Sequence, residues 1–117
     1  MNISVLAELQ RWYYSQSDGD WEHCYGIKID TLDHPGWQLS IDLEETDMED
    51  VSFTEVQHNE MGHHYEDNPD WFVCRKVGSK FVGYSGPEQL EPMLRVFLAW
   101  VKSQPNVTID NDQSSPD

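Results

Sequence analysis

The sequence predicts an α+β fold in which a five-stranded antiparallel meander sheet has an N-terminal and a C-terminal helix packed on one face. Three observations predict it: apolar residues at helical spacing near both ends, alternation of apolar and polar residues between them, and turns rich in Gly and Pro. The 117 residues fit one domain, which we place at residues 1–103. We expect residues 104–117 to form a disordered acidic tail, because they hold no basic residue and little apolar surface.

The N-terminal segment, residues 3–16, is expected to be a helix that ends in the polar run 15–20 at Gly19. Its apolar stripe consists of Leu6, Leu9 and Tyr13, widened by Val5 and Trp12. Two strands follow, because apolar residues then alternate at Tyr25, Ile27 and Ile29 and again at Trp37, Leu39, Ile41 and Leu43. The sequence Asp33-His34-Pro35-Gly36 between them favours a tight turn, so we expect an antiparallel hairpin.

Three more strands are expected around residues 53–58, at 71–77 and at 81–84, with an acidic loop at 44–52 and a polar loop at 59–70. Gly86 and Pro87 then open the second helix, whose apolar stripe is Leu90, Leu94, Phe97 and Val101. Pro92 lacks an N–H donor, so the regular helix is expected from about Glu91. We expect both helices to cover one face of the sheet and leave the other open to solvent or a partner.

The charge is strongly lopsided: 22 acidic residues stand against 7 basic ones, a net charge of −15. Binding to nucleic acid or to an anionic membrane is excluded, because both need clustered Lys and Arg. No apolar run is long enough to span a bilayer, and no basic cluster precedes an apolar run at the N-terminus, so we expect a cytoplasmic protein. Six acids crowd into residues 42–50, which is either a solvated surface or a docking surface for a basic partner.

Candidates for catalysis and metal binding are weak. Cys74 lies inside an expected strand, and the acidic neighbours of Cys24 would raise its pKa, so neither thiol has the surroundings of a nucleophile. The adjacent pair His63-His64 lacks the spacing at which imidazoles converge on zinc. We therefore expect no catalytic residue, no metal and no cofactor. A small Cys-dependent enzyme such as a sulfurtransferase, or a homodimeric scaffold protein, is the alternative.

Three segments near the first hairpin form a tryptophan-rich block: Gly19-Asp20-Trp21-Glu22-His23, Tyr25-Gly26-Ile27-Lys28-Ile29 and Thr31-Leu32-Asp33-His34-Pro35-Gly36-Trp37. With Trp12-Tyr13 before them and Gly86-Pro87 and residues 90–100 after them, they resemble the immunity protein 53 family. The resemblance covers roughly residues 5–101 and departs from the pattern at 44–70, which is longer and more acidic, and at Pro92. It implies an immunity-type domain at 1–103 that belongs to a bacterial polymorphic toxin system and binds a cognate toxin in the producing cell. The charge of the chain adds a hypothesis, that the toxin is a basic nuclease whose cleft is occluded electrostatically.

The candidate residues fall into two groups. Those expected to bind the partner are Glu22, Trp37, Asp42, Glu44, Glu45, Asp47, Glu49 and Asp50. Those expected to carry the motif structurally are Trp12, Gly19, Asp20, Trp21, Pro35 and Gly36. Trp21 and Trp37 could equally pack in the core, and Glu22 could pair with Lys28 instead of facing the partner. Trp37 is the expected anchor if the open sheet face binds, and we expect a monomer or a weak homodimer.

Overall fold

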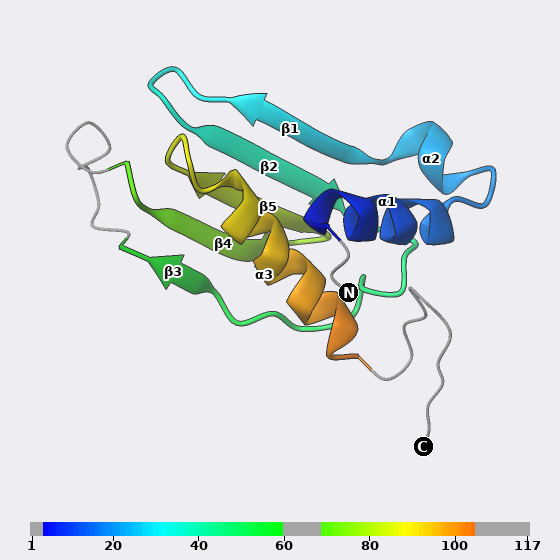
Figure 1. The fold of residues 1–117 in the computed structure, drawn as a ribbon. Helices are drawn as coiled ribbons and strands as arrows, with labels where there is room; N and C mark the ends of the chain where they lie inside the picture. Colours follow the sequence, from blue (N-terminus) through cyan, green and yellow to red (C-terminus); the bar gives the residue numbers. More distant parts are fainter. Residues whose placement is uncertain (1–3, 60–68, 105–117) are drawn as a thin grey trace.

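A computed structural model describes residues 4–59 and 69–104, which form one five-stranded sheet with two long helices on one face (Figure 1). The helices are α1 (Val5–Gln16), α2 (Trp21–Cys24) and α3 (Leu90–Lys102). The strands are β1 (Ile27–Thr31), β2 (Trp37–Asp42), β3 (Val56–His58), β4 (Phe72–Val77) and β5 (Lys80–Ser85). The predicted α+β class, the five antiparallel strands and the two helices are confirmed. All but the first residue of the tail expected at 104–117, and the His63-His64 pair, lie outside the described residues.

The strand order is β1-β2-β5-β4-β3, so the prediction of a sequential meander is wrong. The predicted hairpin of β1 and β2 forms, and β4 and β5 form another, but β2 pairs with β5 and β3 lies at the far edge beside β4. The order follows burial: β2 and β5 place alternate residues in the core, whereas β1 and β3 are largely exposed. Strands that need cover on both sides take the middle of a sheet, and polar or short strands take its edges.

The core between the sheet and the helices is built from aromatic rings. Trp12, Trp21, Phe81 and Phe97 are all fully buried. Trp12 meets Trp21 and Phe97 edge to face, with ring centroids 5.9 and 4.9 Å apart. Aromatic pairs of this geometry add about 0.5–1.5 kcal/mol each beyond the area they bury. Both helices therefore pack through one continuous core onto the same face of the sheet.

The residues at the helix ends determine where α1 and α3 begin. The Ser4 hydroxyl accepts a hydrogen bond from the Ala7 N–H (3.1 Å) and caps α1. Helix α3 begins at Leu90, so Pro92 lies in its first turn, where the missing N–H costs nothing. The short helix α2 was not predicted, and it delays the start of β1 from Tyr25 to Ile27.

Candidate functional site

The acidic loop, residues 44–50, leaves the end of β2 close to the C-terminal end of α1 (Figure 1). Successive turns shape it, because the Thr46 N–H donates to the Leu43 carbonyl (2.9 Å) and the Glu49 N–H donates to the Thr46 carbonyl (3.2 Å). The side chains of Leu43 and Met48 are completely buried and attach the loop to the core. The loop is therefore an ordered structure with its carboxylates on the outside.

Two neighbouring elements hold this loop in place. The Lys76 Nζ, from β4, donates to the carbonyls of Glu49 (2.7 Å) and Val51 (2.8 Å). Gln16, at the end of α1, accepts from the Asp47 N–H (3.3 Å) and donates to its carboxylate (3.4 Å). The sequence analysis missed Lys76 and Gln16, because their partners lie 25 to 31 residues away and no local pattern connects them.

The carboxylates of the acidic loop stand without basic partners. Among the residues that the structure describes, none of its five acids forms an ion pair: Glu44, Glu45, Asp47, Glu49 and Asp50. Helix α1 ends beside the loop with no basic residue in its last turn, so its negative dipole end adds to the same potential. This end of the molecule is the strongest candidate for a contact with a cationic surface.

Asp42 differs from the loop acids although it was predicted with them. Its carboxylate pairs with the Lys80 ammonium (3.2 Å) and accepts a hydrogen bond from the Gly26 N–H (3.0 Å). These contacts join β2 to its two neighbouring strands, so the Asp42 carboxylate has a structural role and its charge is compensated.

Glu22 stabilises the turn before α2. Its two carboxylate oxygens accept hydrogen bonds from the N–H groups of Asp18 (2.9 Å) and Gly19 (2.8 Å), so the alternative of a pair with Lys28 is not realised. Asp18 in return accepts from the N–H groups of Trp21 and Asp20, and these bonds lower the pKa of Asp18. Gly19 allows the turn because its φ is +98°.

The predicted tryptophans all face the helix-covered side. Trp21 and Trp12 are buried in the core. Trp37 shares the covered face of β2 with Leu39 and Ile41, because every second residue of a strand points to the same side. The Trp37 Nε1 donates a hydrogen bond to the Pro87 carbonyl (3.0 Å). Of the two alternatives for Trp37, packing against the core is the one realised, so its ring does not lie on the open face where we expected it to anchor a partner if that face binds.

The β1–β2 turn is fixed by close backbone packing. A Cβ atom on Gly36 would lie 2.5 Å from the Ser85 carbonyl oxygen, so the turn and the end of β5 can approach only if residue 36 has no side chain. Together with the bond from Trp37, this contact gives Pro35-Gly36-Trp37 a structural role at the end of the sheet far from the acidic loop.

The open face of the sheet carries a balanced set of charges. The register places the cations Lys28, Lys80 and Arg75 there, on three different strands. The acids Asp30, Asp42 and Glu55 share this face, and two of them form ion pairs with those cations. A cationic partner finds no net attraction on this face, so the acidic loop at the end of the sheet is the stronger candidate for an electrostatic contact.

Other chemistry has little support in the described residues. Burial raises the pKa of the Cys74 thiol to about 12, so Cys74 is not a thiolate at neutral pH, whereas Cys24 is exposed. In the ranges 4–59 and 69–104, no three His, Cys, Asp or Glu side chains gather closely enough to hold a metal ion. No helix in these ranges has the length and apolar character needed to cross a bilayer.

Comparison with known proteins identifies a family. A family model described as Immunity protein 53 matches residues 6–102, a range that runs from α1 to the end of α3. No curated protein and no solved structure matches the chain.

Proposed function

The chain belongs to the immunity protein 53 family, and we propose from this membership that it neutralises its cognate toxin by covering a basic active cleft with the acidic loop. Membership implies an immunity protein directed against a toxin of a polymorphic toxin system, and thus an inhibitor rather than an enzyme. The proposal adds three statements: the toxin is a nuclease, the contact is electrostatic, and the encounter takes place in the cytoplasm of the producing cell.

The observation that carries the proposal is that the acidic loop has a fixed conformation. Lys76 and Gln16 already hold its backbone in the free protein, so binding does not have to order it. A nuclease cleft must be cationic to bind phosphates, and five unpaired carboxylates on one loop offer it a similar pattern of charge. Steering by these charges speeds association, which an inhibitor of a toxic enzyme requires.

We propose that the free protein is a monomer. A net charge of −15 makes two copies repel each other, and the charge-balanced open face carries partly exposed cations and acids. Light scattering on the purified chain measures the mass directly. A stable dimer in physiological salt would contradict this part of the proposal.

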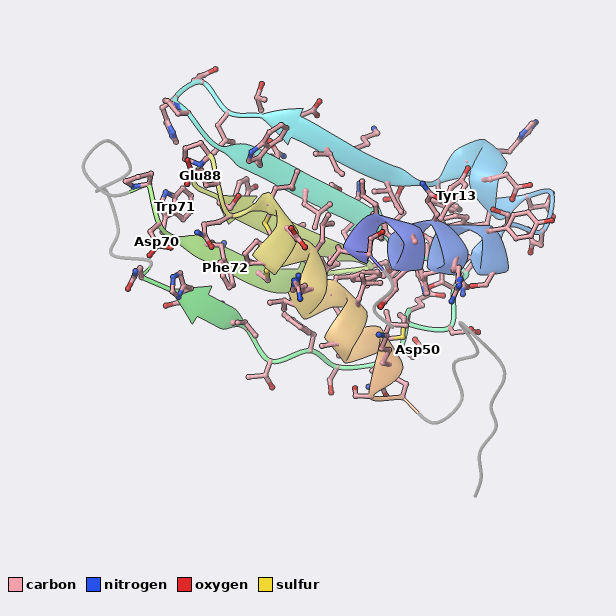
Figure 2. All side chains as sticks on the ribbon, in the orientation of Figure 1. Tyr13, Asp50, Asp70, Trp71, Phe72 and Glu88 are labelled. Atoms are coloured by element: carbon pink, nitrogen blue, oxygen red, sulfur yellow. The ribbon has the colours of Figure 1, made fainter. Side chains whose placement is uncertain are left out.

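Cell protection tests the function and the location of the contact. The toxin domain encoded beside this chain is expressed together with it, and survival is compared between two triple variants. One reverses charge in the loop, at Glu44, Glu45 and Asp47, each replaced by Lys; the other reverses Asp30, Asp33 and Glu88 in the same way. The two variants have the same net charge, and Figure 2 shows Glu88 at the end opposite the loop acid Asp50.

Protection should be lost in the loop variant and retained in the control variant. Equal protection by both would move the contact away from the loop. If the native chain does not protect against the encoded domain, the proposed function itself is wrong for that toxin. Circular dichroism of both variants confirms that each remains folded.

A further inference from the structure

A groove of about 530 Å³ lies between α1 and the start of β1, and its lining residue Tyr25 lies near Glu44 and Glu45 of the acidic loop. Leu6 and Tyr13 line it from α1, and Tyr25 and Ile27 line it from the opposite wall. The groove exists because α3 packs on β4 and β5, so the outer edge strand β1 lacks a helix of its own and exposes most of its residues. Figure 1 shows α1 running beside this edge, and Figure 2 labels Tyr13 on it.

The walls of the groove combine apolar and polar side chains, and the apolar part is partly preorganised. Leu6 is 60% exposed and Tyr13 is 39% exposed, although both are large apolar side chains on an otherwise amphipathic helix. The ring of Tyr13 rests on the buried ring of Trp21, with centroids 5.6 Å apart, so its position does not depend on a partner. Exposed apolar side chains that border a hollow are typical of a binding surface.

The carboxylates of the acidic loop make the electrostatic potential near the groove more negative. Burial of the Tyr25 hydroxyl and the nearby charges of Glu44 and Glu45 raise the pKa of Tyr25. Lys28 and His23 also line the groove, and Asp42 lines it but is already paired with Lys80. Lys28, Glu44 and Glu45 form no ion pair among the described residues, so two acids stand against one cation and the net uncommitted charge beside the groove is negative.

We infer that the groove receives an arginine side chain of the toxin, an inference that rests on the proposed function and names the anchor of the complex. The methylene groups of arginine match the walls formed by Leu6 and Ile27. Its guanidinium stacks on an aromatic face, which Tyr13 and Tyr25 offer, and extends toward the carboxylates of Glu45 and of Glu44, which is hydrogen-bonded to Tyr25. A purely apolar guest would leave those carboxylates unpaired, and an acidic guest would be repelled by them.

Neighbouring tyrosines on α1 provide a matched pair of variants. Tyr13 lines the groove, whereas Tyr14 is 80% exposed and lies outside its lining. Affinity is measured for a catalytically inactive form of the toxin domain encoded beside this chain. Tyr13→Ala should weaken binding about thirtyfold, the loss of an anchor residue, whereas Tyr14→Ala should stay within about twofold. Leu6→Ser repeats the test without disturbing the ring that rests on Trp21.

Double-mutant cycles identify the occupant. Each arginine on the toxin domain is replaced by Ala and combined with Tyr13→Ala; one of these replacements should add almost nothing to the loss that Tyr13→Ala already causes. If Tyr13→Ala and Leu6→Ser bind as tightly as the native chain, the groove is not the anchor, although the proposed function stands. If Tyr13→Ala weakens binding but no toxin arginine couples to it, arginine is the wrong occupant. If the native chain does not bind the domain at all, both the function and the inference are overturned.

Discussion

Replacing Lys76 with Met should release the acidic loop from the sheet while keeping the packing of the side-chain stem. The Lys76 ammonium donates to two carbonyls, at 2.7 and 2.8 Å, and a hydrogen bond to a charged group contributes about 1.5–3 kcal/mol. The freed carbonyls lie near the surface, where water can reach them, so the lower end of that range applies to each bond. The free energy of unfolding should therefore fall by about 3 kcal/mol, which lowers the melting temperature by about 12 °C.

Lys80→Met is the matched control, because it removes the same charge from the next strand. Lys80 pairs with Asp42 at 3.2 Å but is 57% exposed, so the loss should stay below about 1 kcal/mol. Urea unfolding gives both free energies, and amide hydrogen exchange reports whether the loop opens. Lys76→Met should speed exchange in the loop and weaken toxin binding, whereas Lys80→Met should do neither. Equal effects of the two variants would refute the claim that Lys76 preorganises the loop.

Three further results are expected. The triple charge reversal in the acidic loop should slow toxin association more than tenfold in stopped-flow measurements, with the control triple within about threefold; equal rates would place the steering charge elsewhere. A thiol reagent at pH 8 should modify Cys24 alone in the folded protein and both thiols in urea, because burial raises the pKa of Cys74 to about 12. Rapid modification of both thiols in the native protein would contradict the burial of Cys74. Gly36→Ala should cost about 2–3 kcal/mol of unfolding free energy, because its Cβ would meet the Ser85 carbonyl at 2.5 Å; an unchanged urea midpoint would show that the turn can shift.

Local sequence patterns predicted most of the secondary structure. Ile27 and Ile29 alternate with polar neighbours, and so do Leu39 and Ile41. This period of two predicts the two strands of the first hairpin, because only an extended strand places every second residue on one face. The placement of Pro92 in the first turn of α3 also follows from its missing N–H. These features depend on residues that are close in the chain.

Features that depend on distant residues could not be predicted in the same way. Nothing local in β2 indicates that its second neighbour is β5, about 40 residues later, because any exposed strand edge can accept any strand. The charges of Lys28 and Asp30 in β1 do signal an edge strand, and β3 is short and polar enough to be another. Sorting the strands by burial would have favoured the observed order over a meander.

In the candidate site, too, local features could be predicted from the sequence and contacts between distant residues could not. Composition located the acidic loop, since charge density is a local property of the sequence. It could not tell Asp42, which is paired with Lys80, from Glu44 and Glu45, which are not, because the pairing depends on the strand order. Nor could it show that the Glu22 carboxylate serves the turn at Gly19. The groove beside Tyr13 needed the positions of α1 and β1 together.

The dependence of the association rate on ionic strength tests the central claim most directly. The rate constant for the native chain and the inactive toxin domain is measured from about 50 to about 500 mM salt, a range over which the screening length falls severalfold. If unpaired carboxylates on the acidic loop meet a cationic cleft, the rate falls steeply with salt, and the triple loop reversal removes most of that slope. A rate that does not change with salt, or a slope that survives the reversal, would contradict the account.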